Sequence, residues 1–144
     1  MNKFQTSLAG GLFAIFLLSS FSSISAETQT EMTPIDAAIG LEATTLTLNV
    51  PENNNIPWAF VEGKISNPVA EYPVIIQIFD NDLSNDNNVG AVHFAQTEVD
   101  SDGNYEYKFR VANTSNGQTV NIFEGDYTVK IFKVVYLNPG LSAL

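Results

Sequence analysis

The chain has 144 residues, with 16 acidic and 6 basic side chains and a formal net charge of −10. So acidic a chain is repelled by nucleic acid and by anionic membrane surfaces, and we expect neither as a partner. It contains no cysteine and one histidine, His93. This composition excludes disulfides, thiolate metal sites and a cysteine nucleophile, and a histidine-rich zinc or copper site would need more imidazoles.

The first 26 residues follow the plan of a secretory signal. Lys3 precedes an apolar run, Leu8–Leu18, and small polar residues then lead to Ala26. The apolar run is too short to span a bilayer. We therefore predict that residues 1–26 are removed on export and that about 118 residues remain as one domain. The predicted product is secreted or held at the cell surface, with no membrane insertion after signal removal.

Residues 27–43 are predicted to form an N-terminal extension and residues 44–144 the folded body. Within the body, runs of alternating or continuous apolar residues predict strands throughout. Turn-forming residues separate these runs every eight to fifteen positions, and none has the period of an amphipathic helix. The expected strands are Thr44–Val50, Trp58–Ser66, Pro73–Phe79, Val89–Glu98, Tyr105–Val111 and Tyr127–Tyr136.

These strands predict an all-β fold, an antiparallel sandwich of six to seven strands. Pro73–Phe79 is apolar on nearly both faces and is expected to be a central strand. In Val89–Glu98, Val92 and Phe94 are expected on the inner face, which would place His93 on the outer surface.

Four sequence motifs stand in a characteristic order and spacing: Phe60–Ser66 (FVEGKIS), Pro73–Asp80 (PVIIQIFD), Asp100–Tyr107 (DSDGNYEY) and Glu124–Ile131 (EGDYTVKI). Together they resemble the immunoglobulin-like repeat domains of bacterial and archaeal surface proteins, most closely the archaeal secreted and S-layer-associated versions. The resemblance covers about Thr44–Val135. It implies a non-catalytic surface module and carries over no active site. It also implies that Gly125 and Tyr127 open the sixth strand, with the tyrosine ring packed inward.

The sequence departs from that family at its C-terminal end. Immunoglobulin-like sandwiches usually close with a seventh strand paired to the sixth, but only eight residues follow Tyr136, and they include Asn138-Pro139-Gly140. We therefore predict that the C-terminal strand is missing. The sixth strand would then present an open, apolar acceptor edge, which promotes association unless another segment covers it. The acceptor residues are Val129, Ile131 and Val135.

The N-terminal extension offers a segment that could cover this edge. Ile35, Ala37, Ile39 and Leu41 recur at period two, as in a strand that adds itself to a sheet. Added within its own molecule, this segment would close a monomer. Added to the next molecule, it would make a head-to-tail contact and a filament, an arrangement that resembles donor-strand exchange in pilus subunits and archaeal surface threads. A short helical turn or a linker also fits these residues.

Two loops carry candidate sites. Asp80, Asp82 and Asp86 supply oxygen ligands of the kind that Ca²⁺ prefers, although turn-forming loops favour the same residues. Asn113 begins an Asn-Thr-Ser glycosylation sequon. No other cofactor is expected. The aromatic pair Trp58 and Phe60 could either stack on a sugar or pack against the sheet.

Two classes of function follow from the sequence. The first is a non-enzymatic, exported, cell-surface structural or assembly protein, a filament subunit in its most specific form, with copies of itself or other surface proteins as partners. The alternative is a monomeric extracellular module that binds glycan, protein or Ca²⁺. An enzyme is not expected, because no nucleophile is paired with His93 in the sequence.

Overall fold

The computed structural model describes residues 13–17, 28–82 and 90–138. Within these ranges every regular element is a strand, and all the strand pairs are antiparallel. The predicted all-β, sandwich-like class is confirmed. The strands are β1 Phe13–Leu17, β2 Gln29–Pro34, β3 Ile39–Val50, β4 Trp58–Lys64, β5 Val74–Asp80, β6 His93–Thr97, β7 Asn104–Arg110, β8 Ala112–Ser115, β9 Gln118–Asn121 and β10 Gly125–Tyr136.

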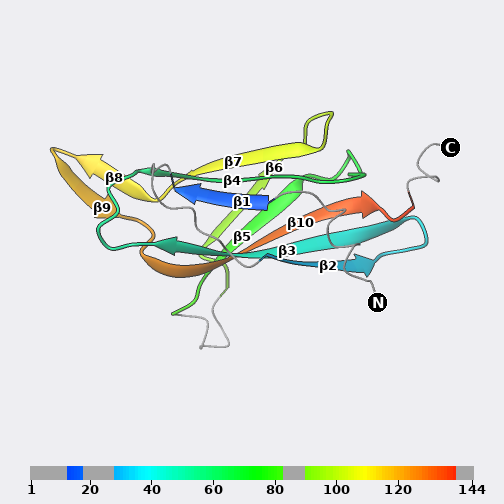
Figure 1. Cartoon of the computed structure of the whole chain (residues 1–144), viewed down its shortest axis with the longest axis horizontal. Coiled ribbons are helices and arrows are strands. Elements are labelled where there is room, and N and C mark those ends of the chain that lie inside the picture. The colour runs from blue at the N-terminus through cyan, green and yellow to red at the C-terminus, as the bar shows by residue number, and fades with distance from the viewer. Residues whose placement is uncertain (1–12, 18–27, 83–89, 139–144) are drawn as a thin grey trace.

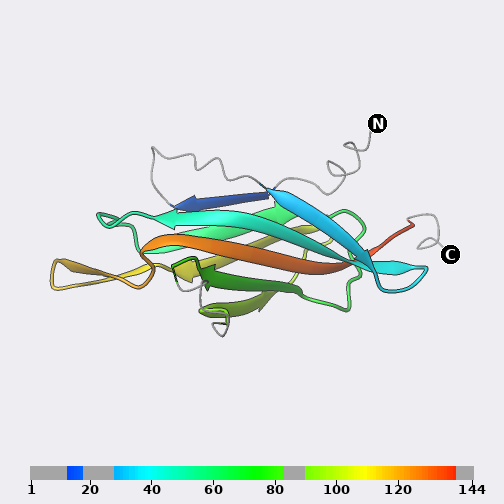
Figure 2. The ribbon, with the colours of Figure 1, turned by 90° about the horizontal axis from the view of Figure 1, so that it is seen from below.

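The strands form two principal sheets and one separate hairpin (Figure 1). The larger sheet has the order β2-β3-β10-β5-β6, and the smaller has the order β1-β4-β7. The third sheet is the β8–β9 hairpin, which extends beyond both principal sheets at one end of the molecule in Figures 1 and 2.

The core lies between the two principal sheets because alternate residues of their strands face one another. Leu46, Leu48 and Val50 of β3 are buried, as are Ala59 and Val61 of β4, and all belong to one apolar cluster. In a sandwich, alternation directs one set of side chains into the core and the other towards solvent. The apolar residues on one face of the predicted strands Thr44–Val50 and Trp58–Ser66 therefore lie in the core.

Six of the strands correspond to the six that the sequence predicts, with shifted ends. The largest shift is in β3, which begins at Ile39 and not at Thr44. The sequence does not predict β2, β8 or β9, because nearly all of their residues are exposed and they lack an apolar period. β5 is central, as expected, since it lies between β10 and β6.

The predicted acceptor edge on β10 is wrong. β10 pairs with β3 along its whole length, from Gly125 to Tyr136, and its residues 127–132 pair with β5 on the other side. Val129, Ile131 and Val135 are all buried. The place expected for a seventh strand is thus held by β3. Leu137 and Asn138 form no strand, and residues 139–144 lie outside the described part of the chain.

The candidate donor residues divide between two elements of the same chain. Ile39 and Leu41 open β3, where they lie opposite Tyr136 and Val134 of β10. Ile35 and Ala37 lie in the exposed turn that joins β2 to β3. The sequence leaves open whether this segment covers its own molecule or another one. In the structure, Ile39 and Leu41 cover this part of β10 within the same chain.

The expected orientation of β6 and the residue before it is also wrong. Val92 is 45% exposed and Phe94 60% exposed, whereas His93 is half-buried. The sequence predicts that the apolar side chains of Val92 and Phe94 face inward. The inner face is instead lined by aromatic rings, and the His93 ring packs against them. Its neighbour Phe123 belongs to a connecting segment for which the sequence predicts no core role.

The inward position expected for Tyr127 is confirmed. Its side chain is 5% exposed, its hydroxyl accepts a hydrogen bond from the backbone N–H of Glu124 at 2.8 Å, and it donates to the carbonyl of the same residue at 3.1 Å. Gly125 has a φ of 99°, a left-handed conformation that favours glycine. Together they fix the entry into β10.

Ile76→Ala tests the assigned core. Ile76 of β5 is fully buried, so the truncation should lower the free energy of unfolding by about 2–5 kcal/mol, because it removes packed atoms and leaves a cavity. Val120→Ala, at a side chain that is 64% exposed, is the control and should change stability by less than about 0.5 kcal/mol. Urea denaturation followed by Trp58 fluorescence measures both. Equal effects would contradict the fold.

Candidate functional site

The outer edge of β4 is the most distinctive feature of the smaller sheet. On one side β4 pairs with β7, from Trp58 opposite Arg110 to Lys64 opposite Asn104. On the other side, Ala59–Gly63 pair with Leu17–Phe13 of β1. β1 lies inside the segment that the sequence predicts to be a removable signal. One edge of β4 is therefore covered only by residues predicted to be absent from the exported protein (Figure 1).

This edge cannot be left open without cost. Ala59 and Val61 are fully buried core residues, so the edge borders the apolar interior. Without β1, a two-stranded β4–β7 sheet would face a five-stranded one. The backbone N–H and C=O groups of Ala59–Gly63 that face β1 would lose their strand partners, and such an edge readily pairs with another chain.

One indication of this pairing is present in the sequence. Phe13–Leu17 is a short continuous apolar run, and such a run fits a buried strand as well as the core of a signal. Composition alone does not distinguish the two.

The solvent face of β4 and β7 is charged. The Lys108 ammonium lies 4.2 Å from the centroid of the Trp58 ring, and the Arg110 guanidinium carbon lies 4.3 Å from it. Glu62 lies opposite Glu106 across the two strands. Because cations already lie over Trp58, its ring is a poor platform for stacking a sugar.

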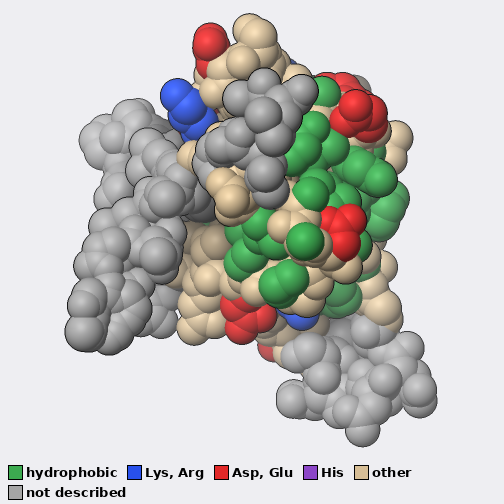
Figure 3. All heavy atoms as spheres, turned by 90° about the vertical axis from the view of Figure 1, so that its right-hand side faces the viewer, with side chains coloured by type: hydrophobic (Ala, Val, Ile, Leu, Met, Phe, Trp, Pro, Cys, Tyr) green, Lys and Arg blue, Asp and Glu red, His purple; other side chains and the backbone are tan. Residues whose placement is uncertain are grey.

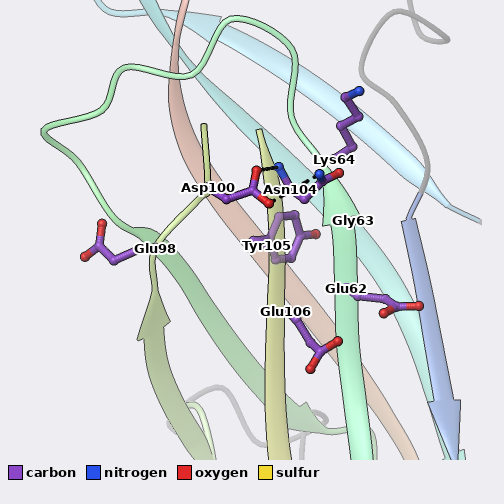
Figure 4. Close-up of a pocket in the computed structure, with 8 residues that line it drawn as sticks. All are labelled: Glu62, Gly63, Lys64, Glu98, Asp100, Asn104, Tyr105 and Glu106. Atoms are coloured by element: carbon purple, nitrogen blue, oxygen red, sulfur yellow. Dashed lines mark hydrogen bonds between the residues drawn. The ribbon is translucent and has the colours of Figure 1, made fainter. Parts of the chain in front are cut away.

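An open hollow of about 630 Å³ lies at the end of β4 and β7 (Figure 4). Figure 4 shows the carboxylates of Glu62, Glu98 and Glu106 pointing in different directions, while Asp100 is bonded to Asn104. In the described part of the chain, no three or more His, Cys, Asp or Glu side chains are grouped to hold a metal ion. The hollow thus gathers negative charge without a convergent set of ligands.

A buried tyrosine borders this hollow. Tyr105 is 3% exposed, and its hydroxyl has no hydrogen-bond partner within the described residues. Burial raises the pKa of this hydroxyl, and the nearby charge of Glu42 raises it further. Glu42 itself, on β3, is 5% exposed, and its burial raises the pKa of the carboxyl. One end of the core is therefore polar.

Lys133 lies next to Glu42 in the β3–β10 register and is also buried. Its ammonium donates hydrogen bonds to the carbonyl of Val69, at 2.7 Å, and to the carbonyl of Tyr72. Burial lowers the pKa of Lys133, and the charges of Glu98 and Glu71 oppose that shift. The side chain anchors the loop between β4 and β5, so its role is structural.

His93 does not stand free on the surface. Its Nε2 lies 2.8 Å from the hydroxyl of Tyr107, and its ring packs near Phe109 and Phe123. Burial lowers its pKa. The half-buried imidazole is thus part of an aromatic cluster with Tyr107, Phe109 and Phe123.

The predicted calcium ligands are only partly described. Asp80 accepts a hydrogen bond from the backbone N–H of Asp82 at 2.9 Å, a local turn, and the Asp82 side chain is exposed. Asp86 lies outside the described residues. The calcium site therefore stays a prediction.

The turn before β7 is held by its own side chain. Asp100 accepts hydrogen bonds from the backbone N–H groups of Asp102 and Asn104, which lower its pKa. Gly103 has a φ of 86°, and a Cβ there would lie 2.3 Å from the carbonyl oxygen of Ile65. This tight turn connects β6 of the larger sheet to β7 of the smaller one.

Asn113 is exposed on β8, in the projecting β8–β9 hairpin. Asn116 and Gly117, both with a positive φ, form the tip of this hairpin. The glycosylation sequon is therefore accessible, and its use stays a prediction.

The comparisons with known proteins add no identification, because no family model, no curated protein and no solved structure matches the chain. Over the described residues, no helix is long and apolar enough to cross a membrane.

The buried carboxyl of Glu42 predicts an unusual pH dependence. Its pKa is raised in the folded state, so the folded protein retains a proton that the unfolded chain releases near pH 4.5. The free energy of unfolding should therefore fall as the pH rises from about 4.5 through the folded-state pKa. The fall should be about 1.4 kcal/mol for each pH unit between the pKa of the unfolded chain and that of the folded protein.

Glu42→Gln should remove that dependence and stabilise the protein at pH 7. Urea denaturation at several pH values measures it. Glu106→Gln, at an exposed position of β7, controls for the loss of one charge. The pKa of His93 is also shifted, but His93 is present in both proteins. The difference in unfolding free energy between wild type and Glu42→Gln therefore reports on Glu42. A difference that does not change with pH would contradict the assignment.

Proposed function

We propose that this protein is an exported, non-enzymatic structural subunit of the cell surface, whose sandwich is completed by a β-strand from another polypeptide at the edge of β4. The observation that carries the proposal is the pairing of Phe13–Leu17 with Ala59–Gly63. A segment with the plan of a removable signal fills this edge, so its removal leaves an apolar edge that requires a strand.

The physical basis is strand addition. Main-chain hydrogen bonds supply affinity in such contacts, and alternate side chains supply specificity. β4 offers an edge for five residues beside the buried side chains of Ala59 and Val61. A donor from a neighbouring copy makes a head-to-tail contact that continues as a filament.

The same proposal assigns the domain to the immunoglobulin-like class of surface modules. The support is the order of the sequence motifs, together with the inward Tyr127 at the start of β10. β3 takes the place beside β10 that a C-terminal seventh strand occupies in that class.

The alternative, a monomeric module that binds glycan, protein or Ca²⁺, has weaker support. Trp58 is covered by Lys108 and Arg110, and the carboxylates around the hollow diverge. An enzymatic role is also disfavoured. The ring of His93, the one histidine of the sequence, packs among aromatic side chains.

Strand addition is tested by comparing the exported, processed protein with the uncleaved chain. The processed protein should form oligomers that resist SDS and dissociate on heating, whereas the uncleaved chain should stay monomeric because β1 covers β4. A synthetic peptide of residues 12–18 should block assembly of the processed protein. The same peptide with Ile15→Pro should not, because proline removes a ladder donor.

Sedimentation and SDS gels with and without heating measure the outcome. A processed protein that sediments as a monomer and binds neither peptide would remove the proposal.

A further inference from the structure

The strand β2 is lightly held. Among the described strands it pairs only with β3, and five of its six residues are exposed. Thr30 is the half-buried exception, with its hydroxyl 3.3 Å from that of Thr44. No residue of β2 belongs to the apolar core cluster. Its detachment would therefore expose little apolar surface, unlike that of a core strand.

The turn after β2 presents apolar side chains to solvent. Ile35 is 56% exposed and Met32, on β2, is 44% exposed. Figure 3 shows apolar side chains gathered on this end of the molecule. The Asp36 carboxylate accepts hydrogen bonds from the backbone N–H groups of Ala38 and Ile39 at 2.7 and 2.9 Å, and the Ile39 carbonyl accepts two more from the N–H groups of Ile35 and Asp36. Exposed, local bonds of this kind open readily. The Leu137 N–H also donates to the Ala38 carbonyl at 2.9 Å, and this bond would have to break when the segment leaves.

The segment Ile35–Ile39 has the length and the spacing of the strand that β4 holds. The edge takes five residues, with positions 13, 15 and 17 opposite Gly63, Val61 and Ala59. Ile35, Ala37 and Ile39 repeat that spacing with apolar side chains. Because opposite residues of paired strands share a face, these three would lie on the core side of β4.

We propose that the donor at the edge of β4 is Ile35–Ile39 of a second copy of this chain, released from its β2–β3 hairpin. This inference rests on the proposed function and names its donor.

A donor from the same copy is excluded by chain length. Only Gly40 lies between Ile39 and Leu41, and these two residues can be at most about 7 Å apart. Packed sheets lie about 10 Å apart. Ile39 therefore cannot occupy the edge of β4 while Leu41 stays paired to Val134 in the opposite sheet. A second copy is free of this restraint.

The register places Asp36 opposite Glu62 on the solvent face, next to Glu106. Like charges in opposite positions weaken a strand pair. Glu62→Lys should therefore strengthen assembly, several-fold at low salt, and Asp36→Lys together with Glu62→Lys should reverse the gain. Sedimentation equilibrium measures both, and the absence of any effect would overturn this register.

The central test compares two matched variants of the processed protein. Ile35→Asp puts a charge into the apolar edge and should raise the concentration needed for assembly roughly a hundredfold or more. Both Ile35 and Val120 are exposed in the single chain, so folding tolerates either change. Val120→Asp, on the β8–β9 hairpin, should assemble like wild type. Circular dichroism confirms the fold of each.

A mixing experiment separates donor from acceptor. Ile35→Asp retains an open β4 edge, and the uncleaved chain retains an intact Ile35–Ile39 segment but a covered edge. Together they should form a one-to-one complex and no longer species. A synthetic peptide of residues 29–39 should bind the processed Ile35→Asp variant, and the same peptide with Ile35→Asp should not.

Two outcomes overturn the donor assignment in different ways. If wild type assembles and Ile35→Asp assembles equally well, the donor is another segment and the proposed function stands. If processed wild type is monomeric, both fail.

Discussion

The pairing of β3 with β10 is the interaction on which the rest of the structure depends. It joins twelve residues of each strand, and β10 also pairs with β5. β10 therefore has a strand partner on both sides and presents no open edge over residues 127–132. The smaller sheet has three strands, and one edge of its central strand β4 is covered by β1, the segment that the sequence predicts to be a removable signal.

The interior is not uniform along this pair. At one end, Leu46, Leu48 and Val50 make an apolar layer. At the other, Glu42 and Lys133 lie side by side and both are buried, with Tyr105 nearby. A buried charge is tolerated only where partners compensate for lost water. Lys133 donates hydrogen bonds to two carbonyls of the loop before β5. These bonds hold the loop to the polar end of the core, and an apolar side chain could not form them.

The proposed exchange links local stability to assembly. A strand that must leave its own molecule has to be weakly held, and β2 with its turn has few buried contacts. A strand that receives must border a core, and β4 does so through Ala59 and Val61. The two properties belong to different sheets, and a single residue, Gly40, separates the proposed donor from Leu41 of β3. This short connection is what makes a second copy the partner.

The local sequence determined six of the ten described strands and most of the core side chains, because alternation and turn residues are local properties. Tyr105–Val111 and Thr44–Val50 are examples, and so is the inward Tyr127. The period-two spacing of Ile35, Ala37 and Ile39, the proposed donor residues, is also a property of the sequence. The sequence could not determine the neighbours of each strand, because β3 and β10 lie about 85 positions apart and their pairing depends on tertiary packing. Only the tertiary structure therefore decided that β10 is central, that His93 faces inward, and that the edge of β4 is covered by Phe13–Leu17. An apolar run has the same composition in a signal and in a strand, so the sequence alone did not show that this segment pairs with β4.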